Sequence, residues 1–406
     1  MSSSARHLPL LGAAPSSPSQ GGPAILAKGF RPFFLLAGVF ATAMLPLWLL
    51  ALAGSFDPGA YLGAMYWHAH EMVFGYAVAV LAGFLLTAVG NWTQRETAVG
   101  LPLAGLCALW ALGRVAMLTA SWLPRGAAAA LDLAFLPVLA VTLARPILAT
   151  KNRRNFVMVA VLVALWALDL AVHLDALGVL PGWRRRGSLL GIDLITLVML
   201  IIAGRVFPMF TRNATRVETI RTVPALEVAA LGSMVAFVAL DAIWPDATVT
   251  ALAAITTATL ATARAFHWGA RHTRSNPMLW ILHLGYAWIV LGLALRGAAH
   301  FTAFIPAPVA THALTVGALG ALTLGMMARV SLGHSGRAIT ASRLTTWSFA
   351  LVTLAALARV FVPLAHAPWY RPSLFLAGTL WSLAFALFTL GYAAVLTAPR
   401  VDGKPG

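Results

Sequence analysis

The sequence predicts an all-α, polytopic membrane protein with about twelve transmembrane helices and both termini in the cytoplasm. Two features of the composition support this fold class: 60% of the 406 residues are hydrophobic and only 10% are charged. Soluble domains average about 25% charged residues, so a soluble enzyme is excluded. Lys and Arg outnumber Asp and Glu by 28 to 12, and they fall between long apolar runs, which is typical of membrane topology and not of nucleic-acid binding.

The elements follow from the lengths of the apolar runs. Residues 1–28 are rich in Ser, Pro and Gly and contain no continuous apolar region of a signal peptide, so we expect a mobile cytoplasmic tail. Residues 29–400 form the transmembrane domain and 401–406 a second cytoplasmic tail. Runs of about 18–25 apolar residues can cross a bilayer as helices. The predicted spans are 33–54, 66–90, 101–123, 127–149, 156–180, 188–210, 223–244, 247–266, 278–300, 307–331, 343–365 and 372–397.

The orientation is predicted from the basic residues. With the N-terminus inside, 20 of the 28 Lys and Arg residues lie on the cytoplasmic side, which favours this orientation. Arg184, Arg185 and Arg186 form an exoplasmic run that opposes the tendency. The loops are short and no internal repeat is convincing, so function must lie between helices or in short loops.

Ionisable residues cluster near the exoplasmic ends of three predicted spans. Such groups are costly in a membrane, usually face the bundle interior and mark function. The second span opens with His68, His70 and Glu71, the fifth places His173 about 10 Å deep, and the tenth places His312 at a similar depth. Imidazole suits haem iron and copper. Each histidine taken alone could equally be structural, but the shared depth favours function.

Helix geometry separates the first two of these histidines. His68 and His70 lie about 200° apart on a regular helix, so they can serve two neighbouring centres but not one. Trp67 shares a face with His70 and could line a flat macrocycle. In the fifth span, Asp169 shares a face with His173 and is placed to orient its ring.

A second set of residues lies near the cytoplasmic face. It consists of His283, Tyr286, Arg205, Arg329 and His334. Arginines there can pair with haem propionates, because the planar guanidinium suits carboxylates, or can simply determine topology. His283 lies some 20 Å from the outer histidines by helix rise, so it cannot bind the same metal.

Cysteine chemistry is largely excluded. The single cysteine, Cys107, cannot form a disulfide scaffold or a cluster held by four thiolates, so histidine remains as the metal ligand. The sequence contains no Cys-x-x-Cys-His, so any haem is held without a covalent bond.

Ordered motifs along residues 29–406 resemble those of the NnrS family. They are Gly29-Phe30-Arg31-Pro32-Phe33-Phe34, Trp67-His68-Ala69-His70-Glu71-Met72, Gly204-Arg205-Val206-Phe207-Pro208, Leu282-His283-Leu284-Gly285-Tyr286, His312-Ala313-Leu314-Thr315-Val316-Gly317 and Arg329-Val330-Ser331-Leu332-Gly333-His334. The resemblance implies a bacterial inner-membrane protein that binds haem b and copper and is linked to denitrification and protection from nitric oxide.

The resemblance leaves the mechanism open. We expect haem on His70 with His312 or His173, assisted by Arg205, and copper on His68 with the remaining imidazole, with Glu71 as a further candidate ligand. If the protein is an enzyme, it is a haem–copper oxidoreductase that acts on nitric oxide with a quinol or a periplasmic electron donor. The alternatives are a secondary transporter, with Asp169 and His173 as a proton relay, and a scaffold or sensor that binds haem without turnover.

Overall fold

The computed structural model describes residues 22–55, 57, 61–124, 126–404 and 406. These residues form helices and no strand, and the fold class is confirmed: among them are 12 helical segments long and apolar enough to cross a membrane. The cytoplasmic orientation of the termini stays a prediction. Of the predicted tail 1–28, residues 1–21 lie outside the described residues, and Lys28 forms an ion pair of 2.5 Å with Glu96.

The spans agree with the predicted apolar runs and differ mainly at their ends. The helices are α1 (Phe30–Leu52), α2 (Ala64–His70), the π-helix η2 (Glu71–Ala77), α3 (Val78–Thr93), α4 (Leu101–Leu118), α5 (Ala127–Leu133), α6 (Phe135–Ala149), α7 (Phe156–Ala176), α8 (Trp183–Thr215), α9 (Pro224–Ile243), α10 (Thr248–Ala265), α11 (Pro277–Ala298), α12 (Ala307–His312), the π-helix η7 (Ala313–Leu319), α13 (Gly320–His334), α14 (Arg343–Ala365) and α15 (Tyr370–Thr397). The largest difference is α8, which has 33 residues and begins before the arginine run at 184–186.

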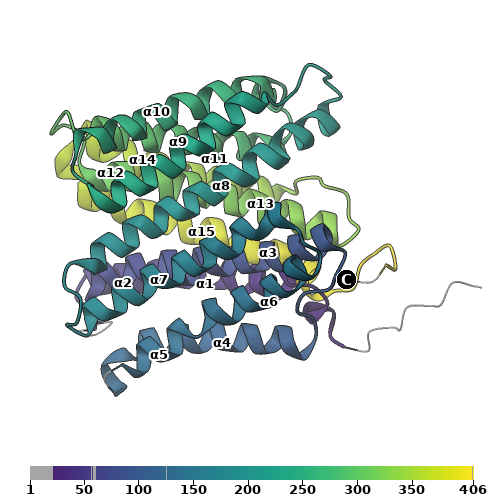
Figure 1. Ribbon diagram of the computed structural model, residues 1–406, viewed down its shortest axis with the longest axis horizontal. Coiled ribbons are helices and arrows are strands. Elements are labelled where there is room, and N and C mark those ends of the chain that lie inside the picture. The colour runs from purple at the N-terminus through teal and green to yellow at the C-terminus, as the bar shows by residue number, and fades with distance from the viewer. Residues whose placement is uncertain (1–21, 56, 58–60, 125, 405) are drawn as a thin grey trace, which may run out of the picture.

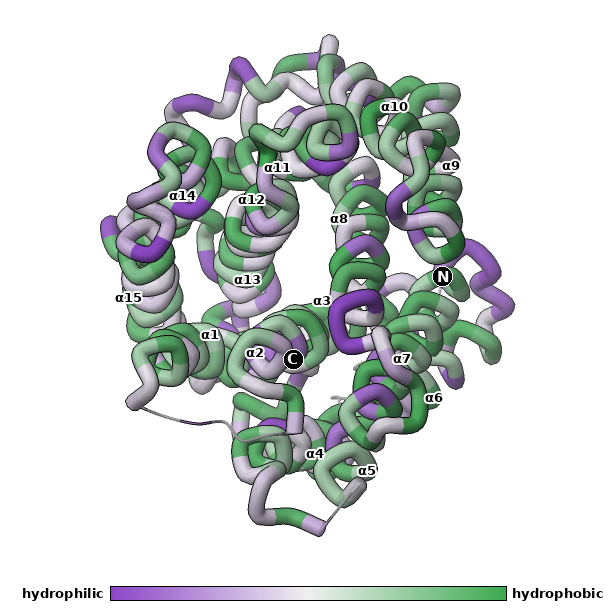
Figure 2. Tube along the Cα trace, turned by 90° about the vertical axis from the view of Figure 1, so that its left-hand side faces the viewer, coloured by the Kyte–Doolittle hydropathy of each residue, from purple (hydrophilic) through white to green (hydrophobic). Residues whose placement is uncertain are grey.

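The helices run side by side along the long axis of the molecule (Figure 1). Both ends of the described chain lie at one end of the bundle, and α2 and α12 lie at the other. Figure 2 views the bundle along its helices, with α3 and α8 near the middle and α4, α5, α9 and α10 at the periphery. On α9 the large apolar side chains Val228, Val235 and Ile243 are exposed, as expected for a surface that contacts membrane lipid.

Two segments far apart in the sequence share the same local architecture. In each, a short helix (α2 or α12) ends at a histidine, a seven-residue π-helix (η2 or η7) follows, and a longer helix (α3 or α13) completes the span. The two histidines are His70 and His312. Short π segments inside α-helices occur frequently at functional sites. No repeat was evident in the sequence, because the likeness lies in backbone winding and not in residue type.

The C-terminal residues pack onto the bundle. Arg31 is buried and donates hydrogen bonds to the backbone carbonyls of Ala398, at 2.6 Å, and Gly406, at 3.1 Å. Arg400 donates two hydrogen bonds to the Asp402 carboxylate, which lower the pKa of Asp402 to about 2. The segment predicted as a cytoplasmic tail at 401–406 contacts the end of the helix domain through its described residues.

Candidate metal centre

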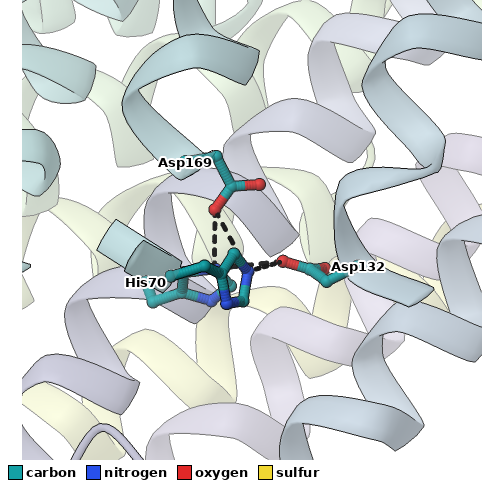
Figure 3. A group of neighbouring side chains, drawn as sticks. His70, Asp132 and Asp169 are labelled. Atoms are coloured by element: carbon teal, nitrogen blue, oxygen red, sulfur yellow. Dashed lines mark hydrogen bonds and ion pairs between the residues drawn. The ribbon is translucent and has the colours of Figure 1, made fainter. Parts of the chain in front are cut away.

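Four buried side chains from three helices place their ligand atoms within 4.8 Å of one another. His70 ends α2, Asp132 lies on α5, and Asp169 and His173 lie one turn apart on α7. The Nε2 atom of His70 lies 2.9 Å from Asp169 Oδ1 and 3.1 Å from Asp132 Oδ2. The Nε2 atom of His173 lies 3.0 Å from the same oxygen of Asp132. Figure 3 shows both carboxylates pointing toward His70. We call these four residues the His/Asp centre.

The opposite ring nitrogens of both histidines are also engaged. Nδ1 of His70 lies 2.9 Å from Glu71 Oε1, and Nδ1 of His173 lies 2.8 Å from the hydroxyl of Tyr61. Burial and the charge of Asp169 raise the pKa of Tyr61 to about 12, so the phenol keeps its own proton, and its oxygen can accept a hydrogen bond from the Nδ1–H of His173. Histidines that bind metals usually have the second ring nitrogen held in this way, which fixes the orientation of the ring.

One arginine links the carboxylates around the centre. Arg114, on α4, donates a hydrogen bond of 2.7 Å to Glu71 and pairs with Asp132. With neutral imidazoles, the three carboxylates of Glu71, Asp132 and Asp169 against this one arginine leave a net charge of 1 − 3 = −2 among these buried groups. Buried charge is costly unless it is compensated. A divalent cation at the four converging ligand atoms would supply the missing positive charge.

Two glycines allow this arrangement. A Cβ atom at Gly75 would lie 2.7 Å from Nη1 of Arg114, and one at Gly113 would lie 2.8 Å from Oδ1 of Asp132. A larger residue at either position would displace a charged side chain of the network. The turn of π-helix that begins at Glu71 follows His70 directly, so the backbone changes its winding at the centre itself.

The donor set indicates the kind of ion. Two imidazole nitrogens and two carboxylate oxygens suit copper(II), which favours nitrogen and oxygen ligands. His70 has a carboxylate at each ring nitrogen, an arrangement satisfied by a doubly protonated ring or by a ring with a metal ion on Nε2. The residues present therefore fit a divalent transition-metal ion, of which copper(II) is one.

The structure separates the other two outer histidines from this centre. His68 stacks on Trp48 with ring centroids 4.0 Å apart, and its buried Nδ1 has no hydrogen-bond partner among the described residues. His312 and His68 lie close enough for their charges to interact, and the positive charge of Arg359 acts on both. His68 and His70 thus point to different surroundings, in line with their angular separation on a helix.

His312 is oriented as a ligand. Its Nδ1 donates a hydrogen bond of 2.6 Å to the backbone carbonyl of Pro308, which leaves the lone pair of Nε2 free. The unpaired buried nitrogen of His68 and this available Nε2 are candidate ligands for haem iron or a metal ion outside the His/Asp centre. Arg359, whose guanidinium lies over the ring of Tyr370, adds a cation beside the two histidines.

Asp169 differs from its expected role. Its Oδ1 lies 2.9 Å from His70 but 3.6 Å from His173, which is oriented instead by Tyr61 and Asp132. The ring of His70 lies edge-on to that of His173, with ring centroids 5.2 Å apart, and is placed between the two carboxylates. Trp67 lies on the same short helix as His70, and its side chain is buried.

The residues of the second predicted set do not form one cluster. His283 lies 2.9 Å from the hydroxyl of Thr211, and the hydroxyl of Tyr286 binds Arg264 and the backbone of Ala261. The guanidinium of Arg329 lies over the ring of Phe210. Arg205 and His334 both line a cavity of about 480 Å³ between α3, α8 and α13. We call this space the inner cavity.

Sequence reasoning missed three residues of the network: Tyr61, Arg114 and Asp132. Arg114 and Asp132 are ionisable residues inside predicted spans, so the rule that such residues mark function could have found them. Tyr61 lies in the connection before α2, and no sequence pattern distinguishes it.

The helices and the His/Asp centre define a polytopic helical membrane protein with a buried site suited to a metal ion. The family model described as NnrS protein matches residues 24–400 of the chain. Because this match covers nearly the whole chain, the protein belongs to the NnrS family. A search of curated proteins found no match.

Proposed function

We propose that this chain is a haem–copper protein of the bacterial inner membrane that binds nitric oxide, in denitrification or in protection from nitrosative stress. The observation that carries the proposal is the His/Asp centre, with two imidazoles and two carboxylates converging in an apolar interior. Membership of the NnrS family supports the haem and nitric oxide parts of the proposal through the properties that the resemblance implies.

In this proposal the His/Asp centre holds copper. His70 and His173 supply nitrogen, and Asp132 and Asp169 supply oxygen. Glu71 and Tyr61 hold the remaining ring nitrogens and so keep both Nε2 atoms directed at the centre. This assignment replaces the expected pairing of His70 with His312, because the Nε2 atom of His70 is directed at the carboxylates.

The haem is assigned to the region of His68 and His312, where one imidazole would bind the iron and the other would stay available beside it. His68 stacks on Trp48, the positive charge of Arg359 lies near both histidines, and the ring nitrogens of His68 and His312 are not engaged by carboxylates in the described residues. Haem iron held there would supply a site at which nitric oxide binds. Nitric oxide is small and weakly polar, so it can reach this site through the membrane interior. Binding needs no electron donor, whereas conversion would need electrons from a quinol or a periplasmic donor.

Purified protein tests the proposal directly. We expect a haem absorption band and about one copper ion per chain by metal analysis, with a nitrosyl signal in spin resonance when the reduced protein is titrated with nitric oxide. His68→Ala or His312→Ala, whichever removes the iron ligand, should lose haem, whereas His70→Ala and His173→Ala should lose copper and keep most of the haem. His272→Ala, in an exposed loop, is the matched control. Copper retained by both His70→Ala and His173→Ala would overturn the assignment.

A secondary transporter is the second candidate, favoured by a separate ion network. Arg296 on α11 pairs with Asp193 on α8, at 2.5 Å, and with Asp241 on α9, at 2.8 Å. Together with the His/Asp centre, these groups could carry protons. Colourless, metal-free protein that couples solute uptake to a proton gradient would favour this function over the first.

A further inference from the structure

Four arginines line a cavity on the side of the bundle, separate from the His/Asp centre. The cavity has a volume of about 670 Å³ and lies where α7 and α9 flank α8. Arg154 precedes α7, Arg205 and Arg212 lie on α8, and Arg221 lies in the connection to α9. We call this space the lateral cavity. Its arginines come from three separate segments of the chain.

These arginines are poorly compensated. The one carboxylate among the described lining residues is Glu227, and its Oε2 already accepts a hydrogen bond of 3.0 Å from Arg264. Arg205 donates to the neutral side chain of Asn155. The side chains of the other three make no hydrogen bond or ion pair with any described residue. The cavity therefore has an excess of positive charge and free guanidinium donors.

The lining changes from charged to apolar along the membrane normal. On α8 the lining runs from Leu197 through Ile201 to Arg205 and Arg212, which is 15 residue steps or about 22 Å of helix. On α9, which runs the opposite way, Glu227 is followed by the apolar Leu231 and Val235. Arg154, just before α7, is followed by Val157 on that helix. All three segments thus place charge at the end of the bundle that holds the chain termini, and apolar side chains deeper (Figure 1).

Membrane topology alone does not explain this gathering. The rule that basic residues collect in cytoplasmic loops predicts their side of the membrane but not that they surround one cavity. Arg271 and Arg274 obey the same rule, in the loop before α11, and line neither of the two cavities described here. The apolar lining also opens toward lipid, because Val157 and Val235 are exposed.

We propose that the lateral cavity binds an anionic phospholipid. The phosphate lies against the guanidinium groups of Arg154, Arg212 and Arg221, which suit phosphate oxygens through paired N–H donors. One acyl chain follows the apolar stretch beside Leu197, Ile201 and Leu231. Basic pockets between transmembrane helices on the cytoplasmic side bind anionic head groups in this way. Arg154 and Arg205 line both cavities, so the bound lipid also closes the side of the inner cavity.

The test measures lipid binding to the intact purified protein. Phosphatidylglycerol is titrated against delipidated protein and followed by native mass spectrometry, with phosphatidylcholine as the lipid without net charge. The variant is Arg212→Gln with Arg221→Gln, and both positions are exposed, so the fold should persist. Each arginine near an anionic head group contributes about a factor of five in affinity, so the double variant should bind phosphatidylglycerol about 30-fold more weakly.

Arg271→Gln with Arg274→Gln is the matched control, since it removes the same charge from the same side of the bundle. It should leave phosphatidylglycerol binding unchanged. Equal losses in both double variants would show a general surface-charge effect and overturn the proposal, as would unchanged binding in the first. Inorganic phosphate that binds without lipid, and that competes fully with phosphatidylglycerol, would show a site for a soluble anion instead. Haem and copper contents should not change in either variant, so this result is independent of the proposed function.

Discussion

Replacement of Asp132 by asparagine tests whether the negative charge of the His/Asp centre contributes to metal binding. Asp132 Oδ2 lies 3.1 Å from the Nε2 of His70 and 3.0 Å from that of His173, and the carboxylate also pairs with Arg114. Asparagine keeps the size of the side chain and one oxygen but removes one negative charge. The net charge of the surrounding groups changes from −2 to −2 + 1 = −1.

The expected loss of affinity is large. Two unit charges about 4 Å apart interact by about 4 kcal/mol at an effective dielectric constant of about 20, and the interaction doubles for a divalent ion. The amide oxygen of asparagine can still bind the ion as a weaker ligand, which offsets part of the lost interaction energy. We therefore expect copper(II) to bind Asp132→Asn at least about 100-fold more weakly, which is about 2.7 kcal/mol.

The assay is copper(II) competition against a chelator of known affinity, with the copper content per chain measured in parallel. Asp193→Asn is the matched control, because Asp193 is also fully buried and paired with an arginine, Arg296, but lies outside the centre. An unchanged copper affinity in Asp132→Asn would refute the reasoning. Equal losses in the two variants would show that the effect comes from general destabilisation and not from the centre.

Three further predictions concern the surroundings of the centre. Glu71→Gln should weaken copper binding by about 10–100-fold without loss of haem, because Glu71 holds Nδ1 of His70 but is not among the four converging residues. Titration with copper(II) measures the affinity, and an unchanged affinity counts against the role of Glu71. His283→Ala should leave the nitrosyl spin-resonance signal of the reduced protein intact, because His283 contacts Thr211 outside the His/Asp centre. Loss of that signal would indicate that nitric oxide binds at the other end of the bundle. A periplasm-specific reporter fused after Gly406 should be inactive, because 20 of 28 basic residues favour a cytoplasmic C-terminus; an active fusion would invert the topology.

The amino-acid sequence determines the membrane fold of this protein almost entirely. Apolar runs of sufficient length must form helices in a bilayer, because no water is present there to satisfy the backbone. For this reason the predicted spans were confirmed, apart from their ends. The same logic shows that His68, His70, His173 and His312 are unusual, since ionisable side chains within spans are costly.

Only the tertiary structure decides which of these histidines meet. Depth can be counted along a helix, but the direction of a side chain depends on how each helix is rotated and which helix it packs against. The π-helices after His70 and His312 shift that rotation, and no residue pattern predicts them. Asp132 and Arg114 reach the centre from α5 and α4, elements distant in sequence from His70. The sequence therefore supplies the ligand types and their depth, and helix packing selects the partners.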